Sequence, residues 1–149
     1  MEDVIIIGAG VIGSFIAHDL CKYQLSIYVI EKEDDVGNVT SMANSAIIHS
    51  GYDPLPHSKK AYYNVKGNEM YTKVTEDLDI PFSRIGSLTL AFSNEEMEEL
   101  KKLQQRATEN GVIVRLLAKE EVLELEPSIS SSVYGALEAP SAGIINPFL

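Results

Sequence analysis

The stretch VIIIGAGVIG, residues 4–13, decides the fold of this chain. Its first four residues, Val4–Ile7, form an uninterrupted apolar run, which is typical of a strand buried on both faces of a parallel sheet. The glycine pattern G-x-G-x-x-G follows, and apolar residues then recur at helical spacing up to about residue 22. Residues 25–30 are again β-branched and apolar. The pattern predicts a β-α-β unit of an α/β fold, with a glycine-rich turn after its first strand.

Each glycine of this turn has a physical role in binding a dinucleotide. Gly8 permits the tight turn, Gly10 lets the backbone approach a pyrophosphate, and Gly13 lets the helix pack against the strand. The helix N-terminus offers unpaired N–H groups and a positive dipole end to the phosphates. Glu31 closes the second strand at about the ~20-residue distance expected of a carboxylate that binds the adenosine ribose hydroxyls. That carboxylate disfavours the 2′-phosphate of NADP but accommodates NAD and FAD. The alternative to a dinucleotide site is a glycine-rich turn that only packs a helix against a strand.

The chain changes character near residue 80. Residues 1–80 are predicted to form a Rossmann-like segment whose last helix is stopped by Pro81. Residues 81–149 are predicted to form a substrate-domain segment of mixed or antiparallel sheet. Its expected elements are a strand at 87–92, a helix opened by a capping box of Ser93 and Glu96 and closed at Asn110-Gly111, a strand at 112–116, a short helix at 119–126 and a strand at 132–137. Two Rossmann strands leave an apolar face and both edges uncovered. We therefore expect this chain to be a fragment of a longer protein, and we expect the fragment to self-associate through the uncovered face.

Composition excludes several classes of protein. The 149 residues carry 22 acidic and 12 basic side chains, a formal net charge of −10, which argues against nucleic-acid binding. No apolar run approaches the ~20 residues of a membrane span, and the N-terminus lacks the basic region of a secretory signal. A single cysteine, Cys21, allows no internal disulfide and suits a reducing compartment. We therefore expect a cytoplasmic protein without a transmembrane segment.

A polar stretch after the second strand helps to separate NAD from FAD. A plain NAD domain should continue with an amphipathic helix and a third parallel strand. Here residues 40–51 read TSMANSAIIHSG, and such small hydroxyl and amide side chains suit a loop along an extended ligand. Gly51 would allow close backbone approach to a flat ring.

Three features together resemble the N-terminal third of FAD-dependent glycerol-3-phosphate dehydrogenases: the turn Gly8–Gly13 with Glu31, residues 40–51, and the run Arg84-Ile85-Gly86-Ser87-Leu88. Residues 142–147 are similar to the run at which such chains leave the substrate domain. More broadly, the chain resembles the D-amino-acid-oxidase and glycine-oxidase superfamily of flavoproteins, which includes the 2-hydroxyglutarate dehydrogenases.

The resemblance implies FAD as the cofactor. The implied contacts, from the pyrophosphate to the isoalloxazine ring, are Thr40, Ser41, Asn44, Ser45, His49 and Gly51. The implied reaction is oxidation of a small anionic hydroxy compound by hydride transfer to flavin N5, with glycerol 3-phosphate to dihydroxyacetone phosphate as first choice. A quinone or another acceptor would reoxidise the flavin.

Two alternatives stay open at this point: a 2-hydroxyglutarate dehydrogenase or oxidase, and a nucleotide-binding module without redox chemistry. We expect the substrate-binding residues to lie beyond residue 149 and this segment alone to be inactive. Peripheral membrane association of the full-length protein is left open.

Three features are candidates for chemistry. His49 is the candidate catalytic residue, because its imidazole could remove the substrate hydroxyl proton; the alternative is that it only shapes the loop. The four glutamates within residues 95–99 open a capped helix, so we expect a solvated face and no metal site. Arg84 is expected to form a surface ion pair in preference to a contact with the substrate anion.

Overall fold

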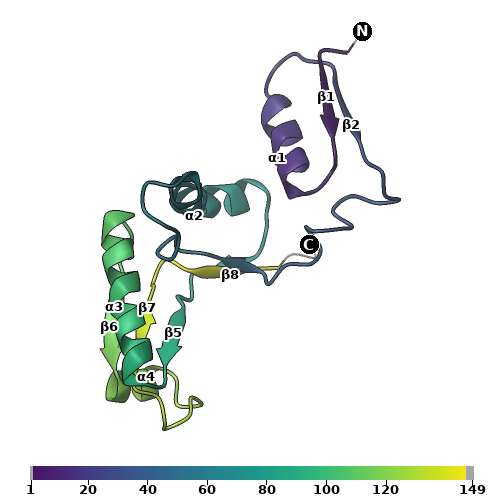
Figure 1. Ribbon diagram of the computed structural model, residues 1–149. Helices are drawn as coiled ribbons and strands as arrows, with labels where there is room; N and C mark the ends of the chain where they lie inside the picture. The colour runs from purple at the N-terminus through teal and green to yellow at the C-terminus, as the bar shows by residue number, and fades with distance from the viewer. Residues whose placement is uncertain (1, 147–149) are drawn as a thin grey trace. The chain divides into compact units, whose positions relative to one another are not determined.

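The computed structural model describes residues 2–146 (Figure 1). These residues fall into two compact units, which are divided between Ser45 and Ala46. The division at Ser45 lies well before residue 80, where the sequence pattern changes, so the long helix that precedes Pro81 belongs to the second unit. Each unit is described by itself below.

The first unit is the predicted β-α-β unit. It consists of β1 (Val4–Ile7), α1 (Val11–Leu20) and β2 (Ile27–Ile30). The two strands are parallel, with Val4 opposite Ile27 and Ile7 opposite Ile30. Figure 1 shows α1 lying along one side of this strand pair.

The apolar run of β1 is typical of a strand buried on both faces, but in this chain one face is exposed, as expected of a sheet with only two strands. Ile6 is buried, whereas Ile7 on the same strand is 87% exposed and Ile5 is 58% exposed. The reason is geometric: a single helix covers one face of a two-stranded sheet, and alternate side chains of the strand point to the other face.

The second unit contains a small sheet that periodicity did not predict. Its strands are β3 (Ile47–Ile48), β8 (Gly143–Ile145) and β4 (Phe82–Ser83), antiparallel and in that spatial order. Strands of two or three residues are too short to show an alternating pattern, so the sequence carries no signal for them.

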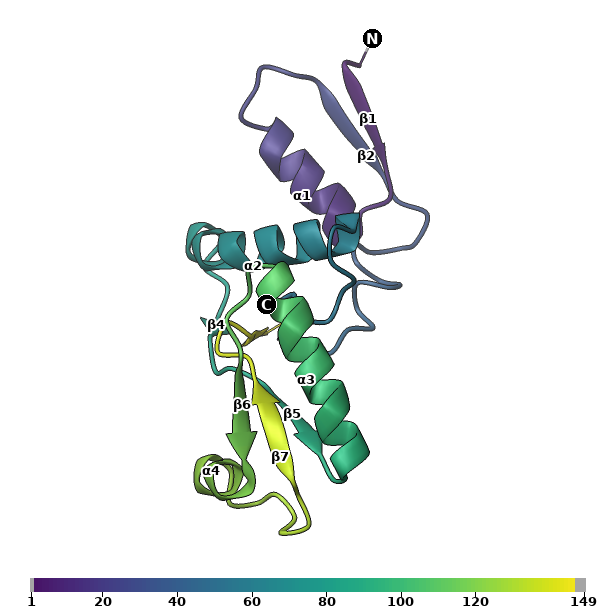
Figure 2. The same cartoon turned by 60° about the vertical axis from the view of Figure 1, so that its left-hand side comes forward.

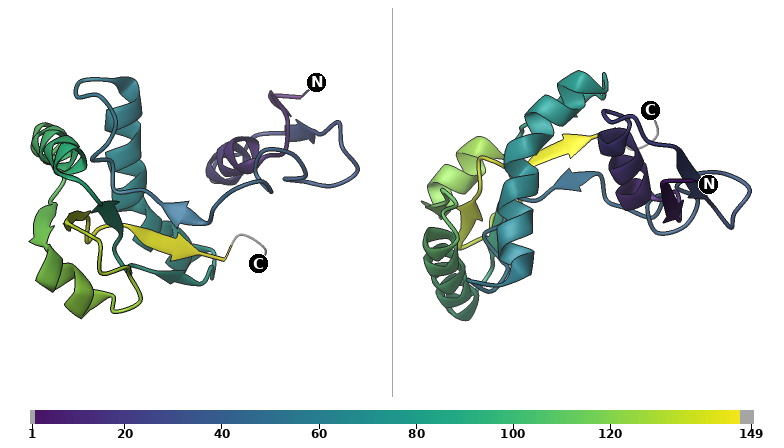
Figure 3. Two further views of the ribbon diagram at one scale, coloured as in Figure 1. Left: turned by 60° about the horizontal axis from the view of Figure 1, so that its bottom comes forward. Right: turned by 90° about the horizontal axis from the view of Figure 1, so that it is seen from above.

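The long helix α2 (Lys59–Asp77) lies beside this small sheet (Figure 3). It begins at Ser58, whose hydroxyl accepts a hydrogen bond from the Ala61 N–H at 3.1 Å. Its three buried residues, Ala61, Asn68 and Thr75, follow one another at seven-residue spacing. Two of these three are polar, which the predicted apolar stripe did not anticipate.

The larger sheet of the second unit has the antiparallel order β5-β7-β6 (Figure 2). Its strands are β5 (Leu88–Ala91), β7 (Gly135–Glu138) and β6 (Arg115–Ala118). Helix α3 (Asn94–Glu109) packs on one face, around Leu100 and Leu137, and the short helix α4 (Lys119–Leu125) packs on the other, around Val122 and Leu117. This sheet and its two helices hold the main core of the unit.

The elements of this sheet were predicted, but two strand boundaries were not. β6 and β7 each begin three residues later than expected. Val112 and Val133 are buried in the core but precede the strands, so their apolar character marks burial and not a place in the hydrogen-bonded ladder.

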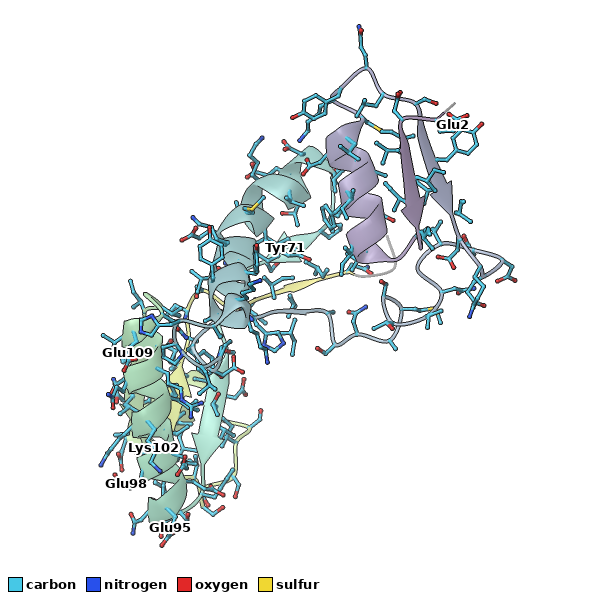
Figure 4. All side chains as sticks on the ribbon, turned by 45° about the horizontal axis from the view of Figure 1, so that its top comes forward. Glu2, Tyr71, Glu95, Glu98, Lys102 and Glu109 are labelled. Atoms are coloured by element: carbon cyan, nitrogen blue, oxygen red, sulfur yellow. The ribbon has the colours of Figure 1, made fainter. Side chains whose placement is uncertain are left out.

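Helix α3 has the predicted ends and a solvated acidic face. The Ser93 hydroxyl accepts a hydrogen bond from the Glu96 N–H at 3.2 Å, and Gly111 takes a left-handed φ of 74° after the helix. The Glu96 carboxylate accepts from the Phe92 N–H, one residue before the position expected of a capping box. Figure 4 shows labelled side chains along this helix, and Lys101 and Lys102 pair with glutamates one turn earlier.

Two findings concern the described residues as a whole. No helix among residues 2–146 has the length and apolar character needed to cross a membrane. Over the same range, no group of three or more His, Cys, Asp or Glu side chains could hold a metal ion.

Candidate functional site

The glycine turn between β1 and α1 has the geometry that a dinucleotide requires. Gly8 has a φ of 98°, a conformation that other residues rarely adopt, and its N–H donates to the Ile30 carbonyl at 2.8 Å. A Cβ atom on Gly13 would lie only 1.9 Å from the Gly8 carbonyl oxygen, so the helix can approach the turn only because residue 13 has no side chain.

Gly10 differs from these two glycines because its backbone is ordinary. Its φ of −73° and ψ of 179° suit any residue, so the absence of a side chain there provides space and not conformational freedom. A Cβ on Gly10 would lie 3.1 Å from Ser41 Oγ, and that hydroxyl accepts a hydrogen bond from the Val11 N–H at 2.9 Å. Ser41 therefore lies at the N-terminus of α1, where the first-turn N–H groups have no intrahelical acceptors.

Glu31 lies one residue after β2 and turns its carboxylate toward the glycine turn. Oε2 accepts a hydrogen bond from the Ala9 N–H at 2.7 Å, and Oε1 accepts from the N–H groups of Lys32 and Glu33 at 2.7 and 3.0 Å. These backbone donors, that of Glu33 foremost, lower the pKa of Glu31 from its ordinary value of 4.5. The carboxylate is thus ionised at neutral pH and keeps acceptor capacity for a further donor.

The other predicted contacts of the first unit lie in the turns after Glu31. Thr40, Asn44 and Ser45 are exposed, and the Asn44 side-chain amide donates to the Ser41 carbonyl at 2.6 Å. This bond closes a local turn that holds Ser41, the residue at the helix N-terminus.

The second unit holds the remaining two predicted residues, His49 and Gly51, directly after β3. The His49 side chain is exposed, whereas Ser50 is 4% exposed and its hydroxyl has no hydrogen-bond partner among the described residues. Gly51 has a φ of 92°, and a Cβ there would lie 2.8 Å from Val65 Cγ2 on α2. The chain can therefore pass this close to α2 only with glycine at position 51.

The ten predicted site residues are thus divided between the units. The structure brings Gly8, Gly10, Gly13, Glu31 and Ser41 together around one turn and one helix N-terminus, with Thr40, Asn44 and Ser45 in the adjoining turns of the first unit. His49 and Gly51 share one short segment of the second unit.

The expected role of Arg84 is wrong. Its guanidinium forms no ion pair within residues 2–146 and instead donates to groups of Asn68, Thr72 and Ser141. It also lies over the Phe82 ring, 5.2 Å from the centroid. The sequence pattern missed Asn68 altogether; its only signal is an amide side chain at the spacing of the buried stripe of α2.

A family model described as FAD dependent oxidoreductase matches residues 3–149. The chain belongs to this family. It is 53% identical over 149 residues to a glycerol 3-phosphate dehydrogenase of Caloramator mitchellensis, a match that covers 99% of this chain and 31% of that protein. It is 36% identical to a glycerol 3-phosphate oxidase of Mycoplasma pneumoniae, covering 99% of this chain and 40% of that one. The chain thus spans well under half the length of these relatives.

A solved structure gives the same result for the fold. Dithionite-reduced L-α-glycerophosphate oxidase from Mycoplasma pneumoniae, with FAD bound, matches with a TM-score of 0.91 at 35% identity, over 99% of this chain and 40% of that one. The predicted flavoprotein resemblance and α/β fold class are confirmed, and FAD is the cofactor of the family.

The residues of the first unit fit the adenosine and pyrophosphate part of FAD. Gly10 places no side chain at the approach to the α1 N-terminus, and Ser41 adds a hydroxyl there. Glu31 presents an ionised acceptor at the end of β2.

Proposed function

We propose that this chain carries the dinucleotide-binding part of an FAD-dependent oxidoreductase that oxidises glycerol 3-phosphate to dihydroxyacetone phosphate. The observation that carries the proposal is the Gly8–Gly13 turn, in which Gly8 has a left-handed φ, Gly10 has no side chain at the helix N-terminus, and the Glu31 carboxylate is hydrogen-bonded to the turn itself. The substrate is supported by the 53% identity to a protein named glycerol 3-phosphate dehydrogenase.

In this proposal, residues 1–80 serve the cofactor and residues 81–149 begin the substrate domain. The turn and the α1 N-terminus hold the pyrophosphate, and Glu31 accepts hydrogen bonds from the ribose hydroxyls. Thr40, Ser41, Asn44 and Ser45 line the cofactor further along, and His49 and Gly51 lie near the ring.

His49 is proposed as the general base. Oxidation of the substrate alcohol to a ketone removes a hydride from carbon and a proton from the hydroxyl. The bound flavin supplies the hydride acceptor at N5, and a quinone or another acceptor later takes the electrons. The exposed imidazole of His49 receives the hydroxyl proton, because one of its ring nitrogens can accept it.

A second substrate has specific support. L-2-hydroxyglutarate dehydrogenases, such as that of Arabidopsis thaliana at 32% identity over 145 residues, match nearly the whole chain. Both substrates are small anionic 2-hydroxy compounds, so the dinucleotide site does not discriminate between them. A nucleotide-binding module without redox chemistry would share this site too.

The test is anaerobic reduction of the flavin in the full-length gene product, followed by the loss of absorbance near 450 nm. Glycerol 3-phosphate is compared with L-2-hydroxyglutarate and with glycerol, which lacks the anion. We expect fast bleaching by glycerol 3-phosphate alone. Bleaching by L-2-hydroxyglutarate alone would make that compound the substrate in place of glycerol 3-phosphate. A protein that retains FAD but bleaches with none of the three compounds would favour the nucleotide-binding module without redox chemistry.

Self-association of the 149-residue chain is a further part of the proposal. The uncovered face of β1 and the outward side of α1 expose large apolar side chains, among them Ile7 at 87% and Ile12 at 74%. Light scattering on this chain should detect oligomers, and the Ile7→Lys variant should form fewer of them. A monomeric wild-type chain would contradict the proposed self-association. The exposed single cysteine, Cys21, supports a reducing compartment such as the cytosol.

A further inference from the structure

The segment that follows β3 is held in place through its backbone carbonyl groups. Within residues 49–54, four carbonyls accept hydrogen bonds from side chains of α2, of α3 and of the residue after α3. The bonds are Asn68 Nδ2 to His49 O at 3.0 Å, Asn110 Nδ2 to Gly51 O and Pro54 O at 3.0 Å each, and Arg106 Nη1 to Asp53 O at 3.2 Å. Side chains thus replace the regular ladder that would otherwise satisfy this backbone.

Asn68 is the buried member of this set. It is 7% exposed and lies midway between Ala61 and Thr75 on the buried stripe of α2, where an apolar residue would be expected. Its amide nitrogen donates to the His49 carbonyl at 3.0 Å and to the Ser141 carbonyl at 2.8 Å, so both N–H groups are used. A buried amide costs free energy unless its groups are bonded, and here each bond joins α2 to another segment.

Arg84 decides which way the Asn68 amide points. Its Nη1 donates to Asn68 Oδ1 at 3.0 Å, and its Nη2 donates to the Asn68 main-chain carbonyl at 2.7 Å. A cationic donor on Oδ1 requires the oxygen on that side, which directs both amide N–H groups toward His49 and Ser141. The same cation polarises the amide and strengthens its donation.

We propose that Asn68, oriented by Arg84, is a positioning residue for His49. This rests on the proposed function, in which the His49 imidazole takes the substrate proton. The bond to the His49 carbonyl fixes the backbone from which the exposed imidazole projects, while Gly51 and Asn110 fix the next turn. Asn68 itself touches neither substrate nor cofactor in this account.

The test replaces the Asn68 amide by an apolar group of similar volume. Asn68→Leu in the full-length holoenzyme should lower the rate of flavin reduction by glycerol 3-phosphate roughly 10- to 100-fold, because small displacements of a reacting group cost that much. FAD content should not change. Thr75→Val is the matched control, since it removes a buried hydroxyl from the same stripe whose bonds stay within α2, and it should alter the rate less than twofold.

A double-mutant cycle separates positioning from general damage. If Asn68 acts through His49, Asn68→Leu should have almost no further effect on the rate of flavin reduction in the His49→Gln background. An Asn68→Leu effect of equal size in both backgrounds would overturn the proposal. A wild-type enzyme without FAD, or not reduced by glycerol 3-phosphate, would instead refute the proposed function.

Hydrogen exchange gives a readout that does not need turnover. Amides of residues 49–51 should exchange faster in Asn68→Leu than in the wild type or Thr75→Val. Should Asn68→Leu fail to fold, Arg84→Gln tests the same contacts from an exposed position. It should reduce the flavin more slowly, and exchange the amides of residues 49–51 faster, than the wild type or Thr75→Val. Unchanged exchange and unchanged rate in a folded variant would overturn the proposal.

Discussion

The two units of this chain differ in what specifies their structure: a short sequence motif in the first and a buried apolar core in the second. The first unit is built around one short motif, and most of its side chains are exposed, including three of the four residues of β2. The second unit carries no comparable motif but has a core in which Leu117, Val122, Leu137 and Ala136 are almost completely buried. The comparison teaches that a motif can specify a turn and a ligand site without supplying a core, and that a core can form without a motif.

The largest effect should come from the most crowded position of the first unit. Gly13→Ala places a methyl group where the Gly8 carbonyl oxygen is 1.9 Å away, so α1 must separate from the turn and FAD should no longer be retained by the full-length protein. Gly67→Ala is the matched control in the second unit, because a Cβ on that helical glycine would have no atom beyond its own helix backbone within 4 Å among residues 2–146.

Gly67→Ala should raise the free energy of unfolding by roughly 0.5–1 kcal/mol through helix propensity and leave FAD content unchanged. Absorbance of the purified proteins and urea denaturation measure the two outcomes. Full FAD content in a folded Gly13→Ala protein would show that the turn tolerates a side chain at position 13, and it would contradict the close approach of α1 to the Gly8 carbonyl.

The second prediction compares core with surface. Leu117→Ala should lower the free energy of unfolding of the 149-residue chain by about 2–5 kcal/mol, because it leaves a cavity in the second unit. Ile7→Ala, on a strand of the first unit, should change it by less than about 0.5 kcal/mol, since that side chain is already exposed. Urea titrations followed by circular dichroism, at low protein concentration, distinguish these values. Equal losses would remove the contrast between the units.

The third prediction concerns the ribose contact. Glu31→Ala in the full-length protein should weaken FAD binding about ten- to a hundred-fold, because a hydrogen bond to a charged acceptor contributes ~1.5–3 kcal/mol. Glu33→Ala is a neighbouring carboxylate control that keeps the backbone donor to Glu31. Equilibrium dialysis gives both affinities. If Glu31→Ala binds FAD as tightly as the wild type, the adenosine ribose of FAD does not bind at the Glu31 carboxylate.

The smallest effect is a pH dependence. The backbone N–H groups around Glu31 lower its pKa, so its stabilising bonds to the glycine turn are fully present above the ordinary value of 4.5 and are lost only as the pH falls through the lowered value. FAD affinity should therefore stay constant from pH 7 to pH 5 as far as Glu31 is concerned. Carbon NMR of the Glu31 carboxyl should give a midpoint below 4.5, and a midpoint above it would contradict the hydrogen bonds described here.

Much of this structure could be predicted because its signals are local. The β-α-β unit follows from the apolar run of residues 4–7, the glycine pattern and the spacing to Glu31, all within about thirty residues. Helix α3 follows from Ser93 at one end and Gly111 at the other. The apolar run of β1 does not by itself tell which of its faces is covered, because a sequence pattern describes what a strand can bury and not what is present to cover it.

The parts that could not be predicted depend on contacts between distant residues. The strands β3, β4 and β8 exist only through pairing across some sixty to one hundred positions, as for Ile48 with Gly143. Asn68 and Arg84 are ordinary residues by their neighbours in sequence, and their role arises when α2, β4 and Ser141 meet.

Gly10→Val in the full-length gene product tests the central claim most directly. The backbone of Gly10 is compatible with any residue, and in the described part of the chain a Cβ there would come within 4 Å of Ser41 Oγ alone. The variant should therefore fold while its side chain fills the space of the pyrophosphate. Equilibrium dialysis should show stoichiometric FAD on the wild type and none on the folded variant. Stoichiometric FAD on folded Gly10→Val would contradict the assignment of the glycine turn as the phosphate site.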